Sequence, residues 1–250
     1  LTSDGSPKLH LWRAAHRNDD MWANRDWEKF GINNLKNTLV DLTVETVDKC
    51  TAKVTSTIKY DGKEGFGAYH ISTYTIKGDG SVKVDNKIDF IGLRINLAHI
   101  GVRMILDKKL DRMTYFGRGP IENYSDRKSG ADVGLYELGV NDQYEYEKPM
   151  DRGNHEDVRW LKFTGNSMPD FVVKSDDNLM QFSALPHTDE QMFPVEYKID
   201  LPASTATVFC LSTKTLGVGS NGCGPRPLDK YMVWSDNSQF TYTIQLLQSK

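Results

Sequence analysis

Cysteine, long apolar runs and an excess of one charge are all scarce in this sequence of 250 residues. Its three cysteines, Cys50, Cys210 and Cys223, are too few and too scattered for a disulfide framework or a zinc site built from thiolates. An odd number leaves at least one free thiol, which favours a reducing compartment. No apolar run approaches the roughly 18 residues that a membrane-spanning helix needs, so we expect no membrane partner.

The charges nearly cancel, with 31 Lys and Arg against 34 Asp and Glu, for a formal net charge of −3. Nucleic-acid-binding proteins carry a clustered basic surface, so we expect no nucleic-acid partner. Aromatic residues make up 10 % of the chain, enough with the β-branched residues to form a packed core, which excludes a disordered chain. The first residues lack both the basic region and the apolar region of a signal peptide. We therefore expect a protein that is not exported or a piece of a longer one.

Alternation of apolar and polar residues, the pattern of half-buried β-strands, runs through most of the chain. In the clearest case, two alternating stretches, 70–77 and 81–90, flank a Gly-Asp-Gly turn and predict a hairpin. The one helical candidate is 19–30. The predicted strands are 39–47, 51–60, 70–77, 81–90, 112–116, 157–164, 171–173, 179–184, 195–201, 205–211 and 240–248. Because many short strands need facing sheets, the sequence predicts one all-β domain over residues 1–250, a large antiparallel β-sandwich.

Isolated motifs give little sign of chemistry. Residues 217–222 satisfy the G-x-G-x-x-G pattern of dinucleotide sites, which requires the loop to open a helix. Prolines 225 and 227 follow instead, so a tight glycine-rich turn is the better interpretation. The six histidines show no metal-ligand spacing. Composition and spacing therefore predict no metal site and no catalytic residue.

A dense motif occupies residues 115–127, with the sequence Y-F-G-R-G-P-I-E-N-Y-S-D-R. Its glycines permit backbone geometry that is closed to other residues, and its polar side chains can pair internally, for example as a carboxylate–guanidinium fork. We expect the cluster to be a structural polar network that holds a turn. Its members are Gly117, Gly119, Pro120, Glu122, Asn123, Tyr124, Asp126 and Arg127.

This motif resembles the G-x-G-P-x-E-N-Y-x-D-R signature in the C-terminal domain of bacterial β-galactosidases of glycoside hydrolase family 2, the lac type. Three further segments are similar to motifs of that family and follow in the same order. They are 11–19 (L-W-R-A-A-H-R-N-D), 153–160 (G-N-H-E-D-V-R-W) and 217–225 (G-V-G-S-N-G-C-G-P). The resemblance covers nearly the whole chain.

The resemblance implies a supersandwich similar to galactose mutarotase, in agreement with the predicted strands. It implies a parent enzyme that hydrolyses terminal non-reducing β-D-galactosides with retention, using two glutamates of an upstream TIM barrel. Since neither glutamate lies in this chain, the chain alone is expected to be inactive. The implied partner is a β-galactoside or oligosaccharide, bound by a homo-oligomeric parent in the bacterial cytoplasm or periplasm. No cofactor is expected here, since the family's Mg and Na belong to other domains.

The resemblance also carries substrate-rim roles to Asn18, Asp19 and the loop that follows them. The family's tryptophan, which stacks on sugar, corresponds to Cys223, and the nearby Trp22 is a candidate to replace it. The family's P-T-D is replaced by Ala-His-Arg at 15–17, and its Q-E by Met-Asp. These departures predict altered selectivity on the aglycone side and allow a substrate other than lactose.

Two other hypotheses remain open. A stand-alone carbohydrate-binding module predicts sugar binding without the barrel, through a row of exposed aromatics that the sequence does not display. An aldose 1-epimerase, suggested by the mutarotase-like fold, requires a histidine acid and a glutamate base in one cleft. Its candidate acids are His99, His155 and His187.

Overall fold

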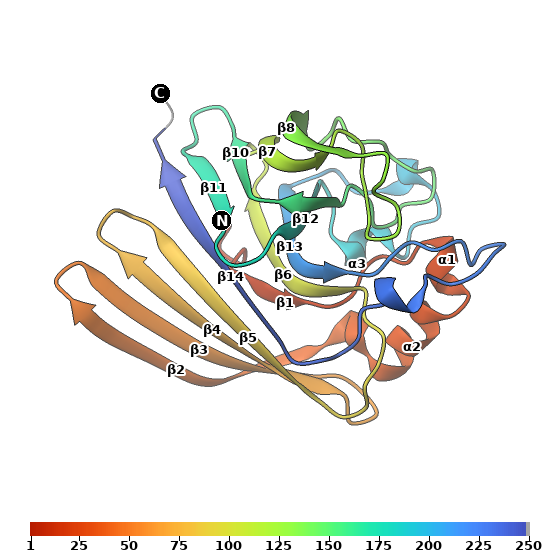
Figure 1. Cartoon of the computed structure of the whole chain (residues 1–250), viewed down its shortest axis with the longest axis horizontal. Helices are drawn as coiled ribbons and strands as arrows, with labels where there is room; N and C mark the ends of the chain where they lie inside the picture. Colours follow the sequence, from red (N-terminus) through yellow and green to blue (C-terminus); the bar gives the residue numbers. More distant parts are fainter. Residues whose placement is uncertain (249–250) are drawn as a thin grey trace.

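The computed structural model describes residues 1–248, which form two antiparallel β-sheets packed face to face (Figure 1). The small sheet has the spatial order β1-β6-β13-β12-β9 and the large sheet the order β2-β3-β4-β5-β14-β11-β10-β7-β8. Every pairing between neighbouring strands is antiparallel. The predicted all-β antiparallel sandwich is therefore confirmed.

Most strands of the large sheet are long, and those of the small sheet are shorter. The small sheet contains β1 (Lys8–His10), β6 (His99–Asp107), β13 (Ala206–Thr215), β12 (Met180–Leu185) and β9 (His155–Val158). The large sheet contains β2 (Lys36–Asp48), β3 (Thr51–Asp61), β4 (Gly67–Lys77), β5 (Val82–Ile91), β14 (Ser238–Leu247), β11 (Asp170–Ser175), β10 (Trp160–Thr164), β7 (Arg112–Gly119) and β8 (Asp132–Gly139). The helices of the described part are α1 (Arg17–Asp20), α2 (Ala23–Phe30) and α3 (Asp189–Met192), with 3-10 turns η1 (Ile32–Asn34), η2 (Lys198–Asp200) and η3 (Asp229–Tyr231).

The core lies between the sheets, where inward-facing side chains of both meet. Phe163 of β10 and Phe209 of β13 are fully buried, and their rings form an edge-to-face contact with centroids 5.0 Å apart. Phe182 of β12 joins the same cluster. Each such ring removes a large apolar area from water, which stabilises the fold by about 25 cal/mol per Å² of buried apolar surface. The aromatic contacts also fix how the two sheets pack.

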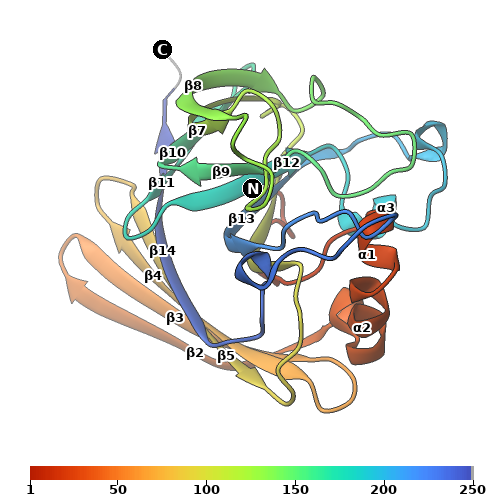
Figure 2. The same cartoon turned by 45° about the vertical axis from the view of Figure 1, so that its right-hand side comes forward.

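The helices and the longest loops gather at one end of the sandwich, on the right in Figures 1 and 2, while the β2–β3 hairpin projects at the other. The predicted helix over 19–30 is divided between α1 and α2. Helix α2 is anchored by the buried indole of Trp27, whose Nε1 donates to the Asn96 carbonyl at 3.1 Å. It ends at Gly31, whose φ of 68° is a left-handed conformation that favours glycine. No helix among residues 1–248 has the length and apolarity to span a membrane.

The predicted hairpin at 70–90 is confirmed as β4 and β5, but two other strand predictions are wrong. The stretch 157–164 is divided between β9 in the small sheet and β10 in the large one, and the break falls at Arg159, two residues after Asp157, whose φ is +54°. The stretch 195–201 alternates like a strand but contains η2 and pairs with no strand, and Ile199 is 87 % exposed. The alternation pattern also failed to predict three strands. β1 is too short to show alternation, β6 is buried on both sides over much of its length, and β8 is interrupted by glycine.

Candidate functional site

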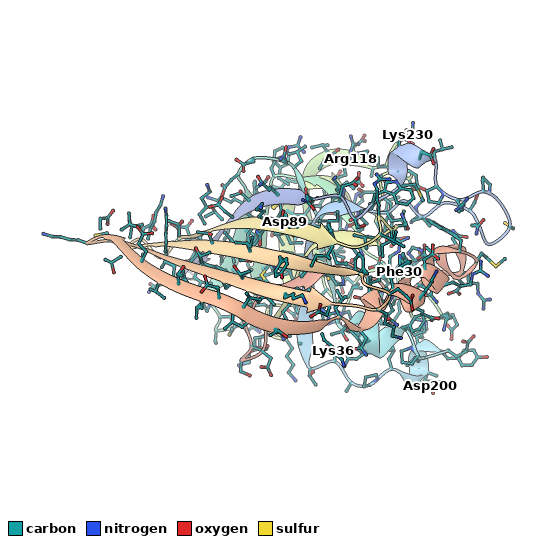
Figure 3. The ribbon with its side chains drawn as sticks, turned by 90° about the horizontal axis from the view of Figure 1, so that it is seen from below. Phe30, Lys36, Asp89, Arg118, Asp200 and Lys230 are labelled. Carbon is teal, nitrogen blue, oxygen red and sulfur yellow. The ribbon has the colours of Figure 1, made fainter. Side chains whose placement is uncertain are left out.

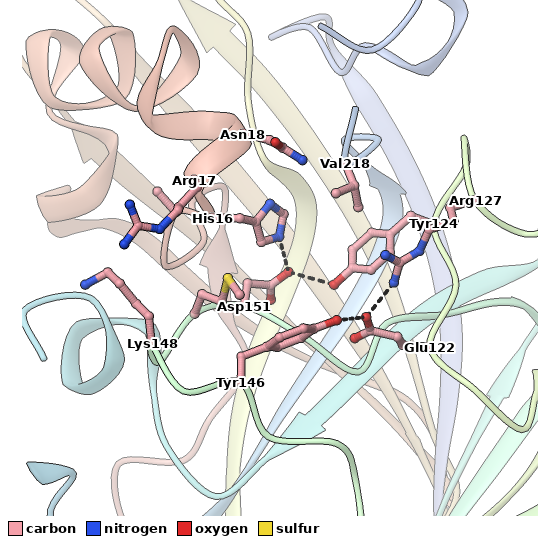
Figure 4. A pocket seen from close by; sticks show the side chains of 12 residues that line it. His16, Arg17, Asn18, Glu122, Tyr124, Arg127, Tyr146, Lys148, Asp151 and Val218 are labelled. Carbon is pink, nitrogen blue, oxygen red and sulfur yellow. Dashed lines mark hydrogen bonds and ion pairs between the residues drawn. The ribbon is translucent and has the colours of Figure 1, made fainter. Parts of the chain in front are cut away.

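A pocket of about 250 Å³ opens at the end where the helices gather (Figure 4). Four segments that lie far apart in the sequence meet there: the start of α1, the motif after β7, the loop before β9 and the glycine-rich loop after β13. The lining residues are Ala15, His16, Arg17, Asn18, Glu122, Tyr124, Arg127, Tyr146, Lys148, Met150, Asp151 and Val218. Three of the four segments that carry the family resemblance thus contribute to one cavity, and the loop before the remaining one completes it.

A buried ion pair stands behind this pocket. Arg13 is fully buried and donates two hydrogen bonds to Asp19, from Nε to Oδ2 at 3.0 Å and from Nη2 to Oδ1 at 2.9 Å. The guanidinium also donates to the Leu216 carbonyl at 2.9 Å. Burial alone would raise the pKa of Asp19, but the charges of Arg13 and His16 hold that pKa well below its usual range. Asp19 is therefore a permanent anion that fixes the start of α1.

Asp151 forms the floor of the pocket and is almost completely buried. The Tyr124 hydroxyl donates to its Oδ2 at 3.3 Å, and Nε2 of His16 lies 3.9 Å from that same oxygen. Nε2 of His99 lies 3.9 Å from Oδ1 on the opposite side. Burial raises the pKa of Asp151, while the charge of Arg13 acts in the opposite direction. The floor thus holds a carboxyl group that takes up a proton more easily than one in water.

Glu122 lies at the side of the pocket, and both of its oxygens already accept hydrogen bonds. Oε1 accepts from Nη2 of Arg127 and from the Tyr146 hydroxyl, both at 2.5 Å (Figure 4). Oε2 accepts from the backbone N–H of Gly153 at 2.8 Å. Burial acts to raise the pKa of Glu122, but these donors lower it below its ordinary value. A carboxylate engaged in this way holds neighbouring segments of the chain in place.

The rest of the motif ties neighbouring chain segments together. Asn123 is fully buried, its Oδ1 accepts from the backbone N–H of Glu156 at 2.8 Å, and its Nδ2 donates to the Ile121 carbonyl at 3.0 Å. The Arg127 guanidinium lies over the Tyr124 ring, 5.7 Å from its centroid. Gly119 and Pro120 are joined by a cis peptide bond at the end of β7. The expected internal pairing of the motif is present, with Glu122 and Arg127 as one of its pairs.

Asp126 connects the motif to the glycine-rich loop. Its Oδ1 accepts from the backbone N–H of Val218 at 2.9 Å, and its Oδ2 accepts from that of Gly219 at 2.7 Å. Glycine is required at 219 because φ is +61° and a Cβ there would lie 2.7 Å from Cδ of Pro227. The G-x-G pattern therefore serves a tight turn that a carboxylate holds, and no nucleotide is needed to explain it.

Asn18 holds the same loop from the side of α1. Its Nδ2 donates to the Gly219 carbonyl at 3.0 Å, and its Oδ1 accepts from the backbone N–H of Gly222 at 2.8 Å. Because Asn18 also lines the pocket, it fixes the glycine-rich loop relative to the cavity. Asn18 and Asp126 together fix residues 218–222 from two sides.

The four rim candidates from the sequence occupy four different environments. Asn18 lines the pocket, whereas Asp19 is buried behind it and has no exposed oxygen to offer a ligand. Trp22 is half-buried in a separate cavity that it shares with Trp234, under the guanidinium of Arg226. Cys223 is exposed on the glycine-rich loop and does not line the pocket. The structure thus brings only Asn18 of the four into this pocket.

Sequence reasoning missed several residues that line the pocket. His16 and Asp151 were noticed as departures from family motifs, at the Ala-His-Arg and Met-Asp positions, but their convergence depends on tertiary packing. Tyr146 and Lys148 lie in a loop without any motif, and no sequence signal indicated them. Among residues 1–248, no group of three or more His, Cys, Asp or Glu side chains is arranged to hold a metal ion. The described residues therefore offer no such cluster for the Mg or Na that the resemblance implies for the parent.

A family model described as beta-galactosidase small chain matches residues 1–246. The chain belongs to the β-galactosidase small-chain family. The match covers every segment that builds the pocket, including the motif at 115–127 and the glycine-rich loop. The resemblance inferred from the motifs is thereby confirmed.

Curated relatives carry the same name. A β-galactosidase from Priestia megaterium is 31 % identical over 175 residues, 70 % of this chain and 17 % of that protein. One from Kluyveromyces lactis is 24 % identical, and the match covers 94 % of this chain and 23 % of that protein. One from Arthrobacter sp. is 27 % identical, and the match covers 92 % of this chain and 24 % of that protein. The chain therefore spans less than a quarter of the length of these relatives.

One solved structure that the chain matches is a GalM/aldose epimerase homologue from C. elegans. It is 12 % identical, with a TM-score of 0.40, and the match covers 84 % of this chain and 69 % of that one. The fold assignment rests on the strand pairing of the chain itself.

Proposed function

We propose that this chain is the C-terminal domain of a bacterial family 2 β-galactosidase, and that it forms a wall of the substrate site of that longer enzyme. The observation that carries the proposal is the convergence of the family motifs on one pocket, within a chain that the small-chain family model matches over 1–246. The parent is proposed to hydrolyse terminal non-reducing β-D-galactosides with retention and to act as a homo-oligomer.

The chemistry of the pocket supports a role in positioning. A retaining glycosidase needs two carboxyl groups about 5 Å apart, one of them free to attack the sugar. In this pocket the Glu122 carboxylate accepts from three donors, and Asp151 is buried under Tyr124 and His16. Both carboxyl groups are engaged in holding neighbouring segments, so we place both catalytic glutamates outside this chain. Any Mg or Na of the parent is likewise assigned to its other domains.

We propose that substrate contacts come from the pocket rim, where Arg17, Asn18 and Lys148 present polar groups. The glycine-rich loop, which carries Cys223 at the family's tryptophan position, lies beside this rim. Since Cys223 lacks an indole face, we expect weaker stacking on the aglycone and hence altered selectivity on the aglycone side.

Asn18→Ala in the longer enzyme tests this role. Loss of the two hydrogen bonds from Asn18 to the glycine-rich loop should raise KM for a nitrophenyl β-galactoside about tenfold, with a smaller change in kcat, because about 1.4 kcal/mol of positioning is lost. Asn221→Ala is the matched control, since Asn221 lies on the same loop and its side chain makes no hydrogen bond among the described residues. Equal KM values for the two variants would contradict a role of Asn18 at the rim.

The geometry does not favour an aldose epimerase. His155 and Glu122 do line one cavity, of about 620 Å³, but burial lowers the pKa of His155 to about 4, so the imidazole is neutral at pH 7. The Glu122 carboxylate already accepts hydrogen bonds from Arg127, Tyr146 and Gly153, which hold its pKa below the ordinary value. His99 is buried against Asp151, and His187 lies against the Pro202 carbonyl at 2.8 Å.

A carbohydrate-binding role that does not need the barrel has one observation in its favour. Trp22 and Trp234 line a cavity of about 270 Å³. Each indole already carries a guanidinium on one face, Arg226 over Trp22 and Arg94 over Trp234. Titration of the chain with galactose in a calorimeter separates this role from the wall proposal, which does not need the chain alone to bind sugar.

A further inference from the structure

The large sheet is wider than the small sheet that covers it. In the described part of the chain, β2 and β3 lie at one edge of the large sheet and run clear of the strands of the small sheet (Figures 1 and 3). Every residue of β2 is exposed. This edge, β2 with the neighbouring parts of β3 and β4, is called the overhang below.

One row of paired side chains shows how the core pattern continues into the overhang. Paired residues on adjacent strands point to the same side of a sheet. Tyr242, Val84, Tyr74, Val54 and Val44 pair in turn across β14, β5, β4, β3 and β2. The first two are fully buried in the core, while Val44 is 72 % exposed. The row is apolar throughout, although only one end of it has a sheet above it.

Two further rows also end in an apolar residue at β2, although polar residues interrupt both of them, His70 in one and Asn86, Ser72 and Ser56 in the other. Leu39 pairs with Ile58, whose row leads to the buried Ile88, and Leu39 itself is 58 % exposed. Leu42 ends the row that begins at the buried Phe240, and it is 55 % exposed. Leu39, Leu42 and Val44, together with Ile76 of β4 at 40 % exposure, make up what we call the overhang face.

The opposite side of the same strands is polar. Asp41, Thr43 and Glu45 of β2 pair with Thr57, Thr55 and Lys53 of β3. The hydroxyls of Thr55 and Thr73 form a hydrogen bond on that side at 3.1 Å. The overhang is therefore as amphipathic as the rest of the sheet. Its apolar side differs from that of the central strands in that the small sheet does not cover it. Exposed apolar patches of this kind mark interaction surfaces.

Two bulges indicate how a partner meets this surface. The register of β2 against β3 shifts between Leu39 and Asp41 and again between Thr46 and Asp48. Bulges on an edge strand disrupt its hydrogen-bonding edge and discourage the addition of another strand. The first bulge also keeps Leu39 on the same side as Leu42. The edge is therefore blocked while the apolar face is preserved, which favours a partner that packs on the face.

We propose that the overhang face packs against an apolar surface on the part of the longer β-galactosidase that lies outside these 250 residues. This inference rests on the proposed function. Its main support is that the chain makes up only 17–24 % of its relatives, so most of such an enzyme lies elsewhere in the polypeptide. Continuity with the core supports it too, since the row from Tyr242 to Val44 is apolar all the way from the buried core to the exposed edge.

Thiol labelling with a maleimide tests the proposal. Exposed Cys50 and Cys223 are first replaced by serine, while Cys210 is buried and stays. Val44→Cys then probes the overhang face, and Thr43→Cys, next to it on the polar side, is the matched control. Both thiols should react rapidly in the 250-residue chain. In the longer enzyme the thiol at 44 should react at least about tenfold more slowly, because it reacts only through local opening, while the thiol at 43 stays fast.

Fast labelling at position 44 in the longer enzyme overturns the proposal. So does slow labelling in the 250-residue chain if sedimentation shows a dimer, because the partner would then be a second copy. Leu42→Cys repeats the measurement if the first variant fails to fold. Hydrolysis of a nitrophenyl β-galactoside is assayed in the same samples. An enzyme that hydrolyses the galactoside but labels fast at 44 refutes only the packing inference, whereas protection without hydrolysis refutes the proposed function.

Discussion

Arg13→Met should lower the free energy of unfolding by about 3–5 kcal/mol, as expected when one partner of a buried ion pair is removed. Asp19 would keep its negative charge in a site from which water is excluded, with the two hydrogen bonds from Arg13 lost. The carbonyl of Leu216 would also lose its donor. Urea denaturation followed by tryptophan fluorescence measures the loss directly.

Two control variants sharpen this test. Arg13→Met combined with Asp19→Leu removes both charges, and it should recover a substantial part of the lost stability because no unpaired ion remains. Arg94→Met breaks a pair of similar two-bond geometry with Asp236 at the surface, where water and salt screen the charges. We expect the free energy of unfolding of that variant to stay close to that of the wild type. A loss below about 1 kcal/mol for Arg13→Met alone would refute the structural role of the pair.

His155 should make the domain sensitive to acid. Its imidazole packs between Tyr115 and Phe182, with ring centroids 4.7 and 5.2 Å away, and burial lowers its pKa from 6.5 to about 4. Between these two values the unfolded chain binds a proton that the folded chain does not. The free energy of unfolding should therefore fall as the pH drops from about 7 to 4, by up to about 3 kcal/mol from this residue.

His155→Gln should reduce that dependence on pH. Burial also lowers the pKa values of His70 and His99, so part of the acid sensitivity remains in the variant. Asp151 acts in the opposite sense, because its raised pKa makes the folded chain bind a proton first, which adds stability as the pH falls. Urea midpoints at several pH values compare the two proteins. An unchanged slope in the variant would show that His155 does not carry the effect.

Local patterns in the sequence were sufficient for much of the fold. The hairpin at 70–90 follows from alternation and a glycine turn, and both are properties of neighbouring residues. The division of 157–164 between two sheets could not be predicted in this way, because β9 and β10 continue the same alternation and a single residue, Arg159, separates them. Likewise 195–201 has the pattern of a strand but no neighbouring strand to pair with.

The candidate site was predictable only in outline. The motif at 115–127 indicated an internal polar network, and Glu122 and Arg127 do pair. The partners of Asp126 lie more than 90 residues away, on the glycine-rich loop, so no local pattern contains them. The same holds for Asp151, whose neighbours His16 and Tyr124 come from two other segments. Family resemblance identified the segments, but only the fold brings them together.

The pocket and the overhang point to the same role for this chain. The side chains that line the pocket are mostly engaged in holding loops, and the apolar edge of the large sheet has no cover among the described residues. Both features fit a domain that is completed by more polypeptide. The central claim is therefore that the chain shapes a substrate site whose reacting groups lie elsewhere.

Turnover of a nitrophenyl β-galactoside by the purified 250-residue chain tests this claim most directly, with the longer enzyme assayed beside it at equal molar concentration. We expect the longer enzyme to release nitrophenol with retention of anomeric configuration and the chain alone to remain at the buffer rate. A rate for the chain alone that matches the enzyme's would contradict the claim, because the nucleophile and the acid would then have to lie within these residues.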